Sequence, residues 1–154
     1  MIAQGFEPKI LAFCCHYCAY ASADLAGSMR IQYPPNVFIV RSPCTGRLEV
    51  EYYLKALERG ADGVIVAGCL EGGCHFIDGN LFAKKRVEQT RKMLAEIGLE
   101  ADRLKMVNVS ASMARPLADH ITNFVETVRK LGPNPLRNQE NISRRDAEAA
   151  EEKI

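Results

Sequence analysis

Residues 63–75, Gly-Val-Ile-Val-Ala-Gly-Cys-Leu-Glu-Gly-Gly-Cys-His, combine a short apolar run with a glycine-rich segment that carries two cysteines. A short run that is apolar throughout is typical of a strand buried on both faces of a parallel sheet. The same arrangement occurs at residues 9–18, where Lys-Ile-Leu-Ala-Phe precedes Cys-Cys-His-Tyr-Cys, and at residues 37–44, where Val-Phe-Ile-Val precedes Cys44. Three predicted strands are therefore each followed by cysteine.

Segments with helical character separate these strands. Residues 19–29 are rich in alanine and other small residues, and apolar side chains recur at helical spacing in residues 50–57, 81–97 and 117–131. Gly60 and Gly98 are well placed to end two of these helices, and Ile97 is expected on an apolar face. A fourth apolar run, residues 105–109, precedes the last helix. The chain thus contains four strand-then-helix units.

Such a repeat predicts an α/β fold, because parallel strands need long crossover connections, which are right-handed. We expect a small doubly wound, flavodoxin-like or Rossmann-like parallel sheet of about four strands in the order 2-1-3-4, with helices on both faces. Residues 1–133 would form this domain. Residues 134–154 hold nine charged side chains and few large apolar ones, so we predict a charged C-terminal tail there.

Composition narrows the function. A net charge of +1 gives no electrostatic footprint for nucleic acid or for an anionic membrane. No apolar run is long enough to span a bilayer and no targeting segment is evident, so we expect a cytoplasmic protein without a membrane partner. Six cysteines in that reducing compartment indicate a metal site, a cluster or redox chemistry rather than structural disulfides.

The placement of the cysteines is the strongest functional signal. In open parallel α/β sheets, ligands bind outside the carboxyl ends of the strands. All six cysteines are predicted at that edge: Cys14, Cys15, Cys18, Cys44, Cys69 and Cys74. Buried cysteines that end strands by chance are the competing explanation.

Three chemistries could use these thiols. Zinc usually takes two paired knuckles, and here only Cys15 and Cys18 form such a pair. A thioredoxin-like thiol–disulfide oxidoreductase would use Cys15 and Cys18 at a helix start, which leaves the later cysteines without a role. A [2Fe–2S] or [4Fe–4S] cluster takes four thiolates from separate loops and fits the whole set better. Gly68, Gly72 and Gly73 would either bring N–H groups to the sulfurs or supply a positive φ.

The segments FCCHYCAYASADLAGSMRIQYPPN (13–36), PCTGR (43–47) and KALERGADGVIVAGCLEGGCHFIDGN (55–80) resemble the delta subunit of methyl-viologen-reducing hydrogenase, which is the iron–sulfur D subunit of non-deazaflavin-reducing hydrogenases. The resemblance implies a [2Fe–2S] cluster. It also implies electron relay between a hydrogenase or formate dehydrogenase and the flavin-containing A subunit of heterodisulfide reductase, in an electron-bifurcating complex. No catalytic residue is expected in this chain.

The resemblance leaves the four iron ligands open. We favour Cys15, Cys44, Cys69 and Cys74, because residues at distinct strand ends converge more easily than adjacent loop residues do. Cys18 or Cys14 could replace Cys15.

Overall fold

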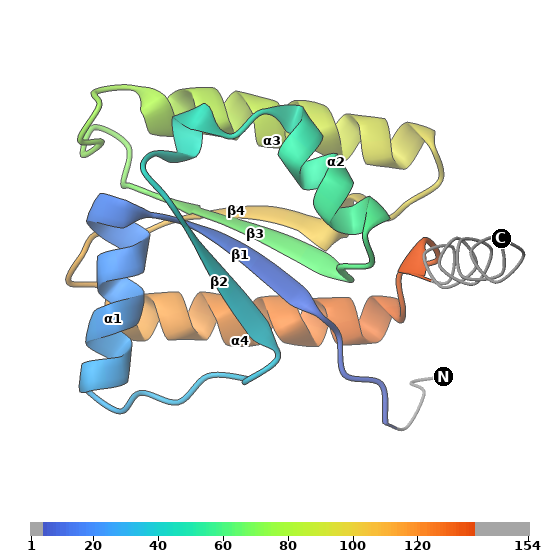
Figure 1. Ribbon diagram of the computed structural model, residues 1–154, viewed down its shortest axis with the longest axis horizontal. Helices are drawn as coiled ribbons and strands as arrows, with labels where there is room; N and C mark the ends of the chain where they lie inside the picture. The colour runs from blue at the N-terminus through green and yellow to red at the C-terminus, as the bar shows by residue number, and fades with distance from the viewer. Residues whose placement is uncertain (1–4, 138–154) are drawn as a thin grey trace, which may run out of the picture.

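The computed structural model describes residues 5–137, which are built around a four-stranded sheet (Figure 1). The strands are β1 (Ile10–Cys15), β2 (Val37–Ser42), β3 (Gly63–Gly68) and β4 (Leu104–Asn108). Their order in the sheet is β2-β1-β3-β4 and every neighbouring pair is parallel. The predicted α/β class and the strand order 2-1-3-4 are confirmed.

Helices cover both faces of the sheet, as predicted. Figure 1 shows α2 (Val50–Glu58) and α3 (Gly79–Glu96) on one face, and α1 (Ala21–Ser28) and α4 (Ala114–Leu131) on the other. Side chains alternate along β3, so that Val64 and Val66 pack under α2 and α3 while Ile65 packs against α4. The two apolar cores therefore share the sheet as their common wall.

Gly60 and Gly98 end α2 and α3, as the sequence predicted, but Ile97 is not on the apolar face where it was expected. At the end of α3, Gly98 has φ +85, the N–H of Gly98 bonds to the carbonyl of Ala95, and that of Leu99 to Leu94. This Schellman turn directs Leu99 into the core, where it is 8% exposed. Ile97, expected on the apolar face, is 67% exposed because the turn begins at its position.

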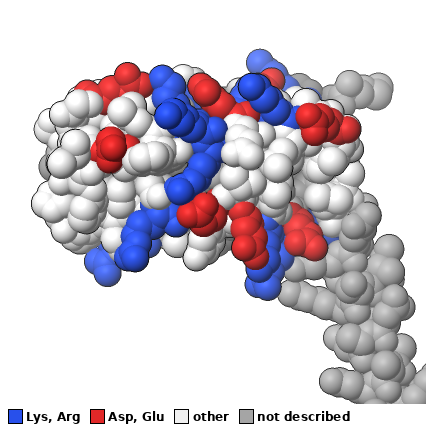
Figure 2. All heavy atoms as spheres, turned by 90° about the horizontal axis from the view of Figure 1, so that it is seen from above, with Lys and Arg blue, Asp and Glu red and all other residues white. Residues whose placement is uncertain are grey.

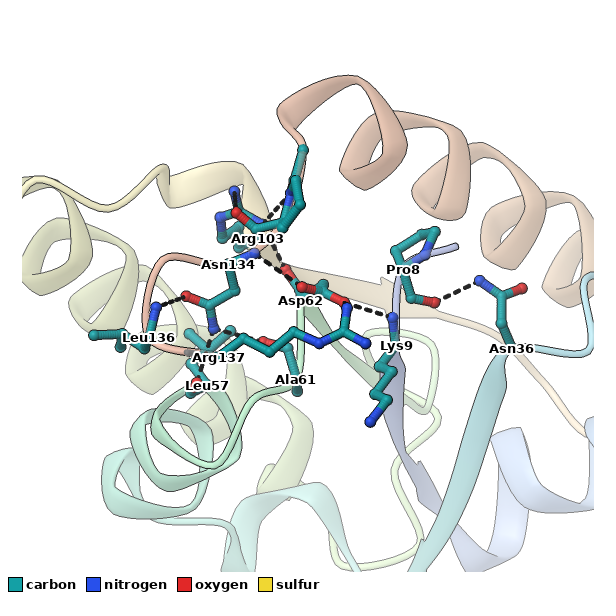
Figure 3. Close-up of polar contacts among 12 residues, drawn as sticks. Pro8, Lys9, Asn36, Leu57, Ala61, Asp62, Arg103, Asn134, Leu136 and Arg137 are labelled. Atoms are coloured by element: carbon teal, nitrogen blue, oxygen red, sulfur yellow. Dashed lines mark hydrogen bonds and ion pairs between the residues drawn. The ribbon is translucent and has the colours of Figure 1, made fainter. Parts of the chain in front are cut away.

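At the amino ends of the strands, a buried polar network joins distant segments (Figure 3). Asp62 is fully buried, and its carboxylate accepts hydrogen bonds from the backbone N–H groups of Lys9 (2.7 Å) and Asn134 (2.8 Å) and from Arg137 (3.2 Å). Arg103 is 1% exposed, and its guanidinium donates hydrogen bonds to the backbone carbonyls of Asp62, Gly132 and Pro133. The same guanidinium forms an ion pair with the carboxylate of Glu100. This network fastens the chain after α4 to the sheet.

The predicted charged tail lies mostly outside the described residues. Of residues 134–154, the structure describes 134–137, and these contact the domain through Asn134, Leu136 and Arg137. The division into residues 1–133 and 134–154 stays a prediction. Within residues 5–137, every helix is too short or too polar to cross a bilayer.

Candidate metal centre

The cysteines follow the carboxyl ends of three neighbouring strands. Strand β1 runs two residues further than its apolar run, so that Cys14 and Cys15 belong to the strand itself. A short π-helical turn, His16–Tyr20, then carries Cys18 ahead of α1. Cys44 lies between β2 and the 3-10 turn Thr45–Arg47, whereas Cys69 directly follows β3. Cys74 lies in the loop before α3.

Three of these thiols form a compact group. The Sγ atom of Cys69 lies 2.8 Å from that of Cys18 and 3.6 Å from that of Cys15. All three sulfurs lie within 4.8 Å of one another, a spacing that could hold a metal ion. Because β1 and β3 are hydrogen-bonded neighbours, the ends of these two strands place Cys15 beside Cys69.

The other two loop cysteines, Cys44 and Cys74, are also neighbours, because the sulfurs of both lie beside Gly79. Gly79, the first residue of α3, allows this approach. A Cβ atom there would overlap the sulfur of Cys44 and lie 3.5 Å from that of Cys74. The two groups are close enough that, in addition to burial, the Cys15 thiol raises the pKa of Cys44 and the Cys74 thiol raises that of Cys18. Five thiols therefore lie near one another at this edge of the sheet, and three of them have the spacing of metal ligands.

Cys14 is directed elsewhere. Strand alternation sends its side chain to the opposite side from Phe13, into the apolar core between the sheet and α4, where it is 1% exposed. Burial, followed by the nearby Cys15 thiol, raises the pKa of Cys14 to about 12. The structure thus brings five of the six predicted site residues together and leaves Cys14 among alkyl side chains.

Backbone N–H groups face four of the five grouped thiols. Burial raises the pKa of Cys15, Cys44 and Cys69, and N–H groups oppose this at each sulfur. At Cys74 the N–H groups outweigh burial. Burial raises the pKa of Cys74, but the N–H groups of Asn80, Phe76 and Gly79 bring it below the usual value. Two of these donors lie in the first turn of α3, where free N–H groups favour a thiolate.

For Cys18 the interactions differ. Burial raises its pKa, and the next largest contributions come from the thiols of Cys69, Cys15 and Cys74. After burial, the pKa of Cys18 is therefore set by neighbouring thiols rather than by backbone N–H groups.

Two asparagines that the sequence patterns did not reveal fix the position of Cys69. The side-chain amide of Asn108, the last residue of β4, donates to the carbonyl of Cys69 at 2.7 Å. The amide of Asn80 donates to the same carbonyl at 3.1 Å and to that of Leu70 at 2.9 Å. Polar residues at a strand end and a helix start were the available signal, but the predicted helix began only at Leu81, after Asn80.

The glycines that lie against the cysteine sulfurs are Gly46 and Gly79, which the sequence patterns did not single out. The N–H group of Gly46 donates to the sulfur of Cys44 at 3.3 Å, and the missing side chain of Gly79 leaves room for two sulfurs. Of the three glycines considered from sequence, Gly72 has φ +80 and lies exposed, which matches a purely conformational role. The N–H of Gly73 bonds to the carbonyl of Leu70 and closes the loop.

Aromatic and apolar side chains surround the thiols at the surface. Tyr17 is 43% exposed, Phe76 48% and Ile77 85%. In Figure 2 the left end, where the loops after the strands lie, is mostly uncharged, while Lys, Arg, Asp and Glu gather over the middle of this face. Two cations border the described part of the site: the guanidinium of Arg41 lies 5.5 Å from the ring centre of Tyr20, and Arg47 lines the hollow beside Cys44. The site thus opens onto a largely apolar surface.

The amino-acid sequence of this chain is similar to those of several known proteins. Residues 10–132 match the family model described as methyl-viologen-reducing hydrogenase, delta subunit. The iron-sulfur D subunit of the F420-non-reducing hydrogenase of Archaeoglobus profundus is 45% identical over 132 residues, which cover 86% of this chain and 96% of that protein. The iron-sulfur D subunit of the vhu F420-non-reducing hydrogenase of Methanocaldococcus jannaschii is 44% identical over 86% of this chain and 99% of its own length.

A longer relative matches the same region. The A subunit of the ferredoxin:CoB-CoM heterodisulfide reductase of Methanosarcina mazei is 44% identical over 126 residues, which are 82% of this chain but only 16% of that protein. In that relative the region similar to this chain is one part of a much larger polypeptide.

Proposed function

The chain belongs to the methyl-viologen-reducing hydrogenase delta subunit family, and from this membership we propose that it is a non-catalytic electron-transfer subunit that holds an iron–sulfur cluster. The observation that supports this most is the compact thiol group of Cys15, Cys18 and Cys69, with Cys44 and Cys74 beside each other at the same edge of the sheet. Cysteine thiolates from separate loops are the usual ligands of such clusters. A bound cluster would accept and release single electrons at this edge.

We propose that the cluster is of the [2Fe–2S] type and is held by Cys15, Cys44, Cys69 and Cys74. Each of these thiols faces at least one backbone N–H group, which would stabilise the negative charge that a ligating sulfur carries. Cys18 lies within the same site and is the alternative to Cys15, whereas Cys14 faces the core. Residues from β1, β3 and the two loops would then surround the iron.

The partners proposed for this chain rest on the names of its relatives and on the family resemblance of its cysteine-bearing segments. One group of relatives is named as iron-sulfur subunits of hydrogenases, and another as the A subunit of heterodisulfide reductases, within which the similar region is a small part. We therefore propose that this chain receives electrons from a hydrogenase or a formate dehydrogenase. It would pass them to a flavoprotein like the A subunit of heterodisulfide reductase, within a complex that carries out flavin-based electron bifurcation.

Thiol electrostatics favour this relay over a thioredoxin-like enzyme built on Cys15 and Cys18. A nucleophilic cysteine of a dithiol enzyme needs a lowered pKa, so that it is a thiolate at neutral pH. Burial instead raises the pKa of both Cys15 and Cys18. Binding to iron removes the proton from a buried thiol and converts this disadvantage into a favourable ligand environment.

The test is anaerobic purification followed by reconstitution with iron and sulfide. We expect about two irons and two acid-labile sulfides per chain, visible absorption, and an electron paramagnetic resonance signal in the reduced protein. A colourless chain that binds zinc, or a metal-free chain that reduces insulin disulfides through Cys15 and Cys18, would contradict the proposal. Co-purification with a flavoprotein and with a hydrogenase or formate dehydrogenase tests the partners separately.

A further inference from the structure

Three aromatic rings meet above the thiols and join the two segments that carry them. The ring of Tyr17, from the turn after β1, stacks on that of His75, from the loop after β3, with centres 3.8 Å apart and planes 13° apart. Phe76 meets both rings edge-on, at 5.8 Å from Tyr17 and 4.9 Å from His75. We call these three residues the aromatic clasp.

Each residue of the aromatic clasp lies close in sequence to a grouped cysteine. Tyr17 lies between Cys15 and Cys18, and His75 and Phe76 directly follow Cys74. A movement of one ring therefore shifts the backbone next to a thiol. Groups that orient metal ligands strongly affect how well a centre holds its metal.

The rings have little to do with the stability of the domain itself. All three side chains are exposed, and none belongs to either apolar core of residues 5–137. Beyond the end of the β1–β3 ladder at Cys14 and Ala67, the clasp and the thiol contacts of Cys69 link the two segments. Stacked aromatic pairs typically contribute about 0.5–1.5 kcal/mol, enough to hold two short loops together.

We propose that the aromatic clasp holds the turn after β1 against the loop after β3 and so positions the thiols of Cys15, Cys18 and Cys74. In this role its residues act through their neighbours' sulfurs and do not touch iron. The inference rests on the proposed iron–sulfur function and adds to it the residues that orient the ligands.

The experiment compares Tyr17→Ala and His75→Ala with the unaltered chain after anaerobic reconstitution. We expect each variant to load iron but to release it to a chelator about tenfold faster, as is usual when groups that support metal ligands are removed. Tyr17→Phe and His75→Phe keep an aromatic ring in the stack and should release iron within about twofold of the unaltered chain. Tyr52→Ala removes a similarly exposed tyrosine, 54% exposed, on α2 and is the matched control.

Rescue by the phenylalanine variants would show that stacking, rather than the polar groups of Tyr17 and His75, positions the thiols. Alanine variants that release iron at the rate of the control would overturn the inference.

A second measurement requires no iron. In the metal-free chain, His75→Ala should increase amide hydrogen exchange in residues 69–78 and leave exchange in β1 and β3 unchanged. If the unaltered chain fails to load iron, the proposed function fails, whereas unchanged exchange in the variant overturns the clasp alone. The two failures are therefore distinguishable.

Discussion

The two ends of the sheet are both meeting points of distant segments, but different forces hold them. At the amino end, the carboxylate of Asp62 accepts three hydrogen bonds from residues 53 to 75 positions away, and Arg103 is nearly completely buried among carbonyls. At the carboxyl end, buried thiols face one another and have weak mutual hydrogen bonds. At the amino end, the carboxylate of Asp62 has its partners within the chain. At the carboxyl end, the thiols would be completed by the proposed cluster.

This comparison predicts that single changes at the two ends fail in different ways. The largest effect is expected for Cys69→Ser, which removes the sulfur at the centre of the thiol group. Iron bound after reconstitution should fall to less than about a tenth, while the free energy of unfolding of the metal-free chain changes by about 1 kcal/mol or less. Iron analysis and urea denaturation measure the two quantities.

The matched control for that variant is Cys14→Ala, a change of the same residue type in the adjacent core. It should keep full iron content and cost about 1 kcal/mol of stability because it removes a buried side-chain atom. Loss of iron in Cys14→Ala, with iron retained in Cys69→Ser, would reverse the assignment of the two cysteines.

At the amino end, Asp62→Ala is expected to lower stability by about 3 kcal/mol, because it leaves buried N–H groups of Lys9 and Asn134 without a partner. Chemical denaturation of the metal-free chain measures this. Asp102→Ala removes an exposed carboxylate that pairs with Arg91, and should cost less than about 1 kcal/mol. Equal losses in the two variants would show that the buried network contributes no more than a surface ion pair.

The third expected effect depends on pH and sharpens the distinction between Cys14 and the other thiols. Burial raises the pKa of Cys14 from 9.0 to about 12 in the folded chain. Between pH 9 and pH 12 the unfolded chain loses this proton and the folded chain keeps it, so stability falls as the pH rises. The slope contributed by one such group is at most about 1.4 kcal/mol per pH unit.

Comparison of the metal-free chain with Cys14→Ala isolates that contribution, because both chains share the other groups whose pKa burial raises, namely Tyr53 and the thiols of Cys15, Cys18, Cys44 and Cys69. The variant should lose stability less steeply above pH 9, and the two slopes should coincide below it. Parallel curves throughout pH 9 to 12 would contradict the burial of the Cys14 thiol.

The smallest effect concerns backbone strain, which lies at the carboxyl end. Ile77 has φ +70, a conformation that is unfavourable for a β-branched residue, and its side chain is 85% exposed. Ile77→Gly should therefore stabilise the metal-free chain, by about 1 kcal/mol. Ile97→Gly changes another exposed isoleucine, one with φ −89, and should destabilise slightly. Destabilisation by both changes to a similar extent would exclude strain at Ile77.

Most of the fold could be predicted from local sequence patterns. Continuous apolar runs predicted the four strands, and helical spacing with Gly60 and Gly98 predicted the helix ends, because those features depend on residues near one another. The prediction that Ile97 lies on the apolar face was wrong, because the Schellman turn directs Leu99 into the core instead. The Asp62 network was not predicted, since nothing near Asp62 indicates a partner 72 residues later.

The candidate site was predictable only as a set of cysteines at one edge. The choice between Cys14 and Cys15 depends on where β1 ends and which face each residue takes, and a continuous apolar run does not reveal that face. Likewise Asn80, Asn108 and the aromatic stack depend on the packing of loops in three dimensions. The resemblance supplied the cofactor and partner expectations, and the membership of the family is confirmed.

The position of β1 and β3 in the middle of the sheet has a consequence for assembly of the centre. Cys15 and Cys69 lie at the ends of the two strands that have neighbours on both sides, so hydrogen bonds to two adjoining strands fix the strands that carry them. Cys18 and Cys74 belong to a short turn and a loop. Insertion of the proposed cluster would therefore require movement of only those two outer segments, with the sheet already folded.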